Sequence, residues 1–194
     1  MLYLITGASG SGKTACLNEV RQILPQIVWF DFDDFGVPEG ADKVWRQQTA
    51  ERWLEEVLKL QNEGKDTGIN GNITFGEILA CPSAEKIEGI KACLLDCGDV
   101  KRVERLINRG TPEHATQDML CWAAWQRMHA VDPQWRPDVI TENGWEEMNW
   151  NYWRNWEKSD QHWQVRTIDT THLAIREVAA AIAGWIKTQA AENS

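Results

Sequence analysis

The chain has 194 residues and a formal charge of −9, from 29 acidic and 20 basic side chains, a length that suits one α/β domain with a sizeable core. The negative balance disfavours an extended nucleic-acid interface, which needs a basic surface, but it allows a local basic cluster that holds a nucleotide. No apolar run approaches the roughly 20 residues of a membrane span or the length of a signal peptide, so we expect a cytoplasmic protein without a membrane partner.

A glycine-rich run between a short apolar segment and a helical pattern is the strongest signal in the sequence. Residues 2–5 predict a buried strand, and the apolar spacing over 16–24 predicts a helix that Pro25 ends. Glycines in the run let several backbone N–H groups point at one phosphate, beside the positive end of the helix. The run fits the Walker A pattern G-x-x-x-x-G-K-[ST], and its residues are Gly7, Ala8, Ser9, Gly10, Ser11, Gly12, Lys13 and Thr14.

This phosphate loop predicts that the chain binds a nucleoside triphosphate. All eight residues of the loop belong to the predicted nucleotide site. Lys13 should reach the β- and γ-phosphates, and the Thr14 hydroxyl should be a ligand of Mg²⁺.

The second predicted strand, 27–30, runs into a turn that carries Asp31, Asp33 and Asp34. Because ligands of an open parallel sheet bind beyond the carboxyl ends of its strands, this turn should lie beside the phosphate loop. The loop, the strand and Asp33-Asp34-Phe35 resemble the P-loop kinases of small molecules, such as uridine kinase, gluconate kinase and chloramphenicol phosphotransferase. The resemblance implies that Asp33 is the catalytic base, which accepts the proton of the substrate hydroxyl. It also implies that Asp31 serves the Mg²⁺ ion or contacts the substrate.

A long amphipathic helix is predicted over 41–62, a short strand within 67–74, one or two helical turns over 75–80 and a strand over 90–95. In the resembling kinases the long helix borders the acceptor pocket, which makes Trp45, Arg46 and Arg52 acceptor-site candidates. Many of those kinases carry a carboxylate at the end of the third strand, where this chain has Ile-Asn-Gly-Asn at 69–72. Binding of Mg²⁺ should therefore depend on Thr14 and the Asp31/Asp33 turn.

A basic helix is predicted over 99–109, and its second half resembles the segment that opens the lid of nucleotide and nucleoside kinases. That resemblance implies that Arg105 stacks on the adenine and that Arg109 reaches the phosphates. The two lie one helical turn apart and so on one face. Arginines that close over a phosphoryl group neutralise its charge and exclude water. Arg102 is a third candidate, and the lid should span about 99–118.

The strand before this helix leaves a second interpretation open. Cys93-Leu94-Leu95-Asp96 also fits the Walker B pattern of an apolar strand followed by an aspartate. Asp96 would then contact Mg²⁺, and the protein would be an ATPase. No glutamate follows Asp96 to polarise a water molecule, and the arginine-bearing helix begins almost at once, so we favour the kinase interpretation.

Eight of the twelve tryptophans fall in a segment of about 117–163, which is predicted to be helical and matches no motif. We interpret these side chains as core packing at one end of the sheet, some of which also form the walls of a pocket. A last strand over 165–168 and a closing helix over 171–187 complete the chain.

Strands that alternate with helices predict a parallel sheet covered on both faces. The resemblance makes this a three-layer P-loop NTPase fold with a five-stranded sheet of order 2-3-1-4-5 and a small helical lid, in one domain over 1–194. The predicted function is an ATP- and Mg²⁺-dependent phosphotransferase for a small-molecule acceptor, such as a nucleoside, nucleotide or sugar-like compound. The alternative is a P-loop ATPase or regulatory switch without such an acceptor.

Overall fold

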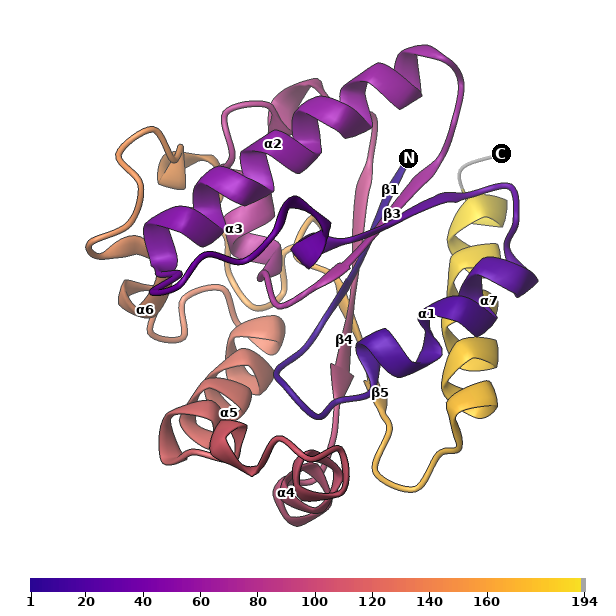
Figure 1. Cartoon of the computed structure of the whole chain (residues 1–194). Coiled ribbons are helices and arrows are strands. Elements are labelled where there is room, and N and C mark those ends of the chain that lie inside the picture. Colours follow the sequence, from indigo (N-terminus) through magenta and orange to yellow (C-terminus); the bar gives the residue numbers. More distant parts are fainter. Residues whose placement is uncertain (193–194) are drawn as a thin grey trace.

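The computed structural model describes residues 1–192 and contains a five-stranded sheet of order β2-β3-β1-β4-β5 (Figure 1). Every neighbouring pair of strands is parallel. The predicted strand order is therefore confirmed, and the carboxyl ends of all the strands meet at one edge. The strands are β1 (Leu2–Thr6), β2 (Val28–Asp31), β3 (Thr67–Gly71), β4 (Ile90–Asp96) and β5 (Val165–Asp169).

Helices cover both faces of this sheet, which confirms the three-layer prediction (Figure 1). One layer consists of α1 (Lys13–Ile23) and α7 (Ile175–Glu192). The other contains α2 (Lys43–Asn62), α3 (Phe75–Ala80), α5 (Gln117–Val131) and α6 (Asp138–Thr141). Helix α4 (Asp99–Asn108) lies beyond the carboxyl ends of the strands, at the bottom of Figure 1. Short 3₁₀ turns are η1 (Phe32–Phe35), η2 (Ala84–Lys86), η3 (Pro112–His114) and η4 (Trp150–Tyr152).

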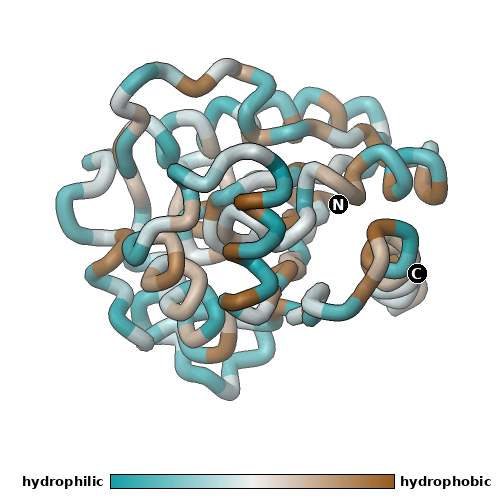
Figure 2. Tube along the Cα trace, turned by 60° about the horizontal axis from the view of Figure 1, so that its bottom comes forward, coloured by the Kyte–Doolittle hydropathy of each residue, from teal (hydrophilic) through white to brown (hydrophobic). Residues whose placement is uncertain are grey.

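The central strand β1 separates two apolar cores. Because side chains alternate along a strand, Tyr3 and Ile5 join the core under α1 and α7, whereas Leu2 and Leu4 join the core under α2 and α3. All five residues of the strand are buried, as expected for a parallel sheet covered on both faces. Hydrophilic residues, teal in Figure 2, make up much of the outer loops. Within residues 1–192, no helix is both long and apolar enough to cross a bilayer.

The tryptophan-rich segment is less helical than predicted. Within 117–163 the chain forms α5, the single turn α6 and the 3₁₀ turn η4, and the remainder is turns and irregular structure. Pro133 and Pro137 follow the end of α5 and cannot continue its hydrogen bonds.

Indole groups attach this irregular segment to the helices, as the core-packing interpretation predicted. Trp153 is 2% exposed and donates from Nε1 to Gly76 O at 2.8 Å. Trp163 is 4% exposed and donates from Nε1 to His129 O at 3.2 Å. These two side chains hold the segment 142–163 against α3 and α5.

Candidate active site

The phosphate loop connects β1 to α1 and depends on three glycines with positive φ, at +149° for Gly7, +77° for Gly10 and +100° for Gly12. Two of them also lie against other groups. A Cβ at Gly7 would stand 2.4 Å from Leu95 O, and one at Gly10 would stand 2.9 Å from Arg102 Cγ. The loop therefore needs glycine for both its backbone conformation and its close packing. Gly12 is the N-cap of α1, so the loop ends at the N-terminus of a helix.

Lys13 lies between the loop and the acidic turn. Its Nζ donates to the carbonyl oxygens of Gly7 and, at 3.2 Å, Ala8. Burial, together with the charge of Arg102, lowers the pKa of Lys13 to about 8, although the carboxylates of Asp31 and Asp33 act in the opposite direction.

Thr14, the predicted Mg²⁺ ligand, is an exposed side chain in the first turn of α1. Its hydroxyl and the carboxylate of Asp31 are oxygen donors, the type of ligand that Mg²⁺ prefers. The residues present therefore fit the ion that the resemblance implies.

The three aspartates of the acidic turn have different hydrogen-bond and charge partners. Asp31 Oδ1 accepts from the Asp33 N–H at 3.2 Å, and Asp34 Oδ2 accepts from the Asp31 N–H at 3.1 Å, which together form a capping box on η1. Asp31 Oδ2 also accepts from Asn70 Nδ2 at 3.3 Å. Asp33 contributes its N–H to this network, and its carboxylate is near enough to Lys13 for the two charges to interact. Burial and the nearby Asp31 raise the pKa of Asp33, against the opposing charge of Lys13.

Arg105 of α4 lies next to the phosphate loop. Its Nη1 donates to Thr170 Oγ1 at 3.0 Å and to Gly10 O at 3.4 Å, and its Nη2 donates to Thr170 O. Thr170 is fully buried, and its hydroxyl lies 2.8 Å from the carbonyl oxygens of Ser11 and Asp96. The end of β5, helix α4 and the loop are thus joined through one arginine and one threonine.

Arg109, the second predicted lid arginine, is not brought to the loop. Helix α4 ends at Asn108, and Gly110, with φ at +80°, turns the chain. Arg109 is exposed, and its Nε donates to Thr111 Oγ1 at 3.0 Å. The Arg109 N–H still donates to Arg105 O at 3.0 Å, so the two residues lie one helical turn apart as predicted, but the Arg109 side chain bonds to the turn that follows α4.

Asp96, the candidate Walker B carboxylate, lies between two arginines. Its Oδ1 is 3.0 Å from Arg102 Nη2, and its Oδ2 is 2.7 Å from Arg127 Nε. Each carboxylate oxygen has a guanidinium partner, which does not favour the ATPase interpretation of this residue.

Polar side chains gather where β3 ends, and two of them come from the segment 117–163 that matched no motif. Asn72 Oδ1 accepts from Trp122 Nε1 at 2.8 Å and from Gln126 Nε2 at 3.2 Å. The guanidinium of Arg46 lies 4.9 Å from the centre of the Trp122 ring and pairs with the buried carboxylate of Glu77 at 2.6 Å. Arg46 is therefore at this edge of the sheet.

The other two acceptor-site candidates pack on the acidic turn. The Arg52 guanidinium lies 3.9 Å from the centre of the Phe35 ring, and Trp45 meets the Phe32 ring edge-on at 6.1 Å. The sequence did not predict that Asn72 and Glu77 are the partners of Trp122 and Arg46. The Thr74-x-x-Glu77 pattern of a capping box, which the structure contains, could have placed Glu77 at a helix start.

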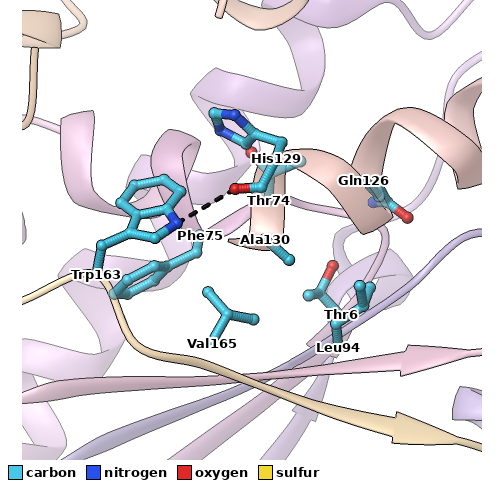
Figure 3. Close-up of a pocket in the computed structure, with 9 residues that line it drawn as sticks. All are labelled: Thr6, Thr74, Phe75, Leu94, Gln126, His129, Ala130, Trp163 and Val165. Atoms are coloured by element: carbon cyan, nitrogen blue, oxygen red, sulfur yellow. Dashed lines mark hydrogen bonds between the residues drawn. The ribbon is translucent and has the colours of Figure 1, made fainter. Parts of the chain in front are cut away.

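A small cavity lies between α5 and the sheet (Figure 3). Its volume of about 20 Å³ has room for roughly one water molecule, which is too little for a kinase acceptor. In Figure 3 the Trp163 and Phe75 rings close one side of it. Burial lowers the pKa of His129 to about 4, so this side chain is neutral at pH 7. The lining residues are Thr6, Thr74, Phe75, Leu94, Gln126, His129, Ala130, Trp163 and Val165.

No family model and no curated protein matches this sequence. Solved structures with a similar fold include a sugar kinase from Janibacter sp. HTCC2649, at 15% identity over 96% of this chain and 92% of that one, with a TM-score of 0.59. Shikimate kinase from Acinetobacter baumannii is 15% identical over 97% and 93%, with a TM-score of 0.53. A gluconokinase from Sinorhizobium meliloti 1021 is 13% identical over 99% and 96%, with a TM-score of 0.51. The chain therefore has a P-loop kinase-like fold.

Proposed function

We propose that this chain is an ATP- and Mg²⁺-dependent phosphotransferase that acts on a small-molecule acceptor, such as a nucleoside, a nucleotide or a sugar-like compound. The observation that carries the proposal is the position of Asp33, an exposed residue whose carboxylate lies close enough to Lys13 for each charge to shift the other's pKa. A base beside the phosphate-binding lysine is the arrangement that phosphoryl transfer to a hydroxyl group needs. The similarity to a sugar kinase and a gluconokinase supports the same class of reaction.

In this proposal the residues of the loop, Gly7 to Thr14, bind the phosphates through backbone N–H groups and the charge of Lys13. Thr14 and Asp31 hold the metal ion. When bound, ATP would supply the phosphoryl group and Mg²⁺ would neutralise part of the phosphate charge. Arg105 adds a fixed positive charge next to the loop at Gly10 and borders the nucleotide.

Asp33 orients the acceptor hydroxyl and takes up its proton. Its raised pKa makes the carboxylate a stronger base than an isolated aspartate, because partial desolvation and the charge of Asp31 disfavour its charged form. The acceptor would lie over the ends of β2 and β3, with Asn72, Arg46 and Trp122 along its border. Segment 99–118 would be the lid, with α4 already in contact with the loop.

The alternative, an ATPase or switch without an acceptor, would need a carboxylate such as Asp96 to serve the metal ion. Two guanidinium groups hold that carboxylate, so the geometry favours the kinase. A coupled assay of ADP release with Mg-ATP and a panel of nucleosides, nucleotides, sugars and polyols tests this choice. We expect at least one acceptor class to raise ADP release far above the rate in water, with a phosphorylated product visible by mass spectrometry.

An ADP release rate that no acceptor changes, and that Asp96→Asn abolishes while Asp33→Asn leaves it intact, would overturn the proposal in favour of the ATPase. The Lys13→Ala variant serves as the control for background phosphatase, because it removes the phosphate-binding charge.

A further inference from the structure

Arg102 is a charged side chain buried directly beneath the phosphate loop. It is 1% exposed, and its Nη1 donates to Ser9 O at 2.8 Å and to Ala8 O at 3.4 Å. Its Nη2 donates to Cys97 O at 3.0 Å and pairs with Asp96 Oδ1 at the same distance. One guanidinium therefore connects two loop carbonyls to the end of β4.

These contacts fix which way the peptide groups of the loop face. A peptide plane whose carbonyl oxygen points inward at Arg102 must turn its N–H to the other side, where a phosphate group would bind. Gly10 lies so close to the arginine that any Cβ would clash with Arg102 Cγ at 2.9 Å. The glycine and the arginine thus form one packed unit, and the loop conformation depends on where Arg102 is held.

Asp96 holds Arg102, and Arg127 of α5 in turn holds Asp96. The distance from Arg127 Nε to Asp96 Oδ2 is 2.7 Å, and Arg127 Nη2 donates to Asp99 Oδ1 at 2.9 Å. The carboxylate of Asp96 is 18% exposed and has one guanidinium on each oxygen. Such a carboxylate is poorly placed to bind a divalent cation, because the cation would have to displace an arginine.

We propose that Arg127, Asp96 and Arg102 are positioning residues for the phosphate loop. Arg127 fixes the Asp96 carboxylate, Asp96 fixes the Arg102 guanidinium, and Arg102 holds the carbonyl groups of Ala8 and Ser9. The importance of this set for nucleotide affinity rests on the proposed function, whereas its effect on the loop itself does not.

Helix α5 also carries Trp122 and Gln126, which donate to Asn72, so one helix supports both the donor side and the acceptor side of the site.

The test compares Asp96→Asn and Arg127→Gln with a matched control, Arg136→Gln. Arg136 also pairs with an aspartate, Asp138, at 2.7 Å, but it is exposed and belongs to the segment between α5 and α6. Binding of N-methylanthraniloyl-ATP is measured by energy transfer from the tryptophans, once with Mg²⁺ and once with EDTA. We expect Kd to rise about tenfold in both test variants, by the same factor in EDTA as in Mg²⁺, and to stay unchanged in the control.

The double variant Asp96→Asn/Arg127→Gln should bind no worse than the weaker single variant, because the residues act in series. Arg127→Lys, which keeps the charge, should recover part of the affinity. An affinity loss in Asp96→Asn that appears only with Mg²⁺, together with wild-type binding by Arg127→Gln, would overturn the proposal and make Asp96 a metal contact.

Hydrogen exchange of the nucleotide-free protein separates this inference from the proposed function. Peptides that span residues 7–14 should exchange faster in Asp96→Asn and Arg127→Gln than in the wild type and in Arg136→Gln. If the wild-type protein binds no nucleotide, the proposed function fails, but faster exchange in the loop still supports the positioning role. Unchanged exchange in both variants would overturn the inference whatever the nucleotide result.

Discussion

Arg105 donates to both oxygen atoms of Thr170, which lies 65 residues away at the end of β5. The same threonine hydroxyl lies 2.8 Å from Ser11 O in the phosphate loop. Three segments of the site that are distant in the sequence therefore meet at one buried side chain.

Replacing this threonine tests how much the site depends on it. Thr170→Val keeps the shape of the side chain but removes the buried hydroxyl oxygen that accepts a hydrogen bond from Arg105 Nη1. We expect a loss of about 1–3 kcal/mol in the free energy of unfolding, measured by urea denaturation. Thr188→Val is the control, because the exposed Thr188 hydroxyl donates to Gly184 O within α7, and it should change stability by less than about 0.5 kcal/mol. If the two substitutions lowered the free energy of unfolding equally, the hydrogen bonds of the Thr170 hydroxyl would contribute no more to stability than a surface hydroxyl does.

Asp33 should carry the proton transfer, and its neighbour Asp34 should not. For the best acceptor from the panel, Asp33→Asn should lower kcat about 10²- to 10⁴-fold, while the Kd for ATP stays within about threefold. Asp34→Asn retains an oxygen that can accept from the Asp31 N–H, so kcat should be nearly unchanged. A similar loss of kcat in both variants would mean that the shape of the turn matters and that Asp33 is not the base.

Features of the site that are local in the sequence could be predicted, and those that depend on distant contacts could not. The loop, Lys13 and the acidic turn belong to short runs whose backbone needs are visible in their residue types. Arg102 appeared only as one of three arginines on a basic helix, because the carbonyl group that it holds lies 93 residues earlier, at Ser9. The partnership of Asp96 with Arg127 depends in the same way on how α5 packs.

The fold followed from the alternation of strands and helices, whereas helical spacing alone did not predict the contacts of Arg109 or of the tryptophan-rich segment. Arg109 lies one helical turn after Arg105, but its guanidinium bonds to Thr111 in the following turn, a contact that helical spacing does not reveal. The tryptophans of 142–163 are spaced as on a helix in places, yet indole hydrogen bonds to distant backbone groups, such as Gly76 O, hold an irregular chain there.

Nucleotide binding should take up protons near pH 8. The pKa of Lys13 is about 8 in the free protein, and polyphosphate binds the charged form, so binding must raise this pKa. At pH 8 about half of the molecules must gain a proton, and affinity should fall about tenfold per pH unit above this value. Isothermal titration calorimetry in two buffers with different ionisation enthalpies measures the uptake, which we expect to be about 0.5 protons per ATP analogue. Lys13→Met, titrated at higher concentration, should take up none, and zero uptake by the wild type at pH 8 would contradict the role of this lysine.

His129 should make the protein less stable in mild acid. Its side chain is 2% exposed, and burial lowers its pKa to about 4, against about 6.5 in an unfolded chain. Above pH 6.5 the histidine is neutral in both the folded and the unfolded state, so it does not change the free energy of unfolding with pH in that range. Below pH 6.5 the unfolded state binds the proton first, so stability falls with pH until the folded state is protonated near pH 4. The expected loss attributable to this residue is about 2 kcal/mol between pH 7 and pH 5.

Urea denaturation at pH 7, 6 and 5 measures this loss by comparison of variants. His129→Gln removes the titrating group, so its stability, although lower at pH 7, should decrease less than that of the wild type as the pH falls. His162→Gln is the control, because His162 is exposed beside Asp160, and its pH dependence should stay close to that of the wild type. If the stabilities of the wild type and His129→Gln changed equally with pH, His129 would be protonated as easily in the folded as in the unfolded state. The surroundings of His129 would then be more accessible to water than its burial indicates.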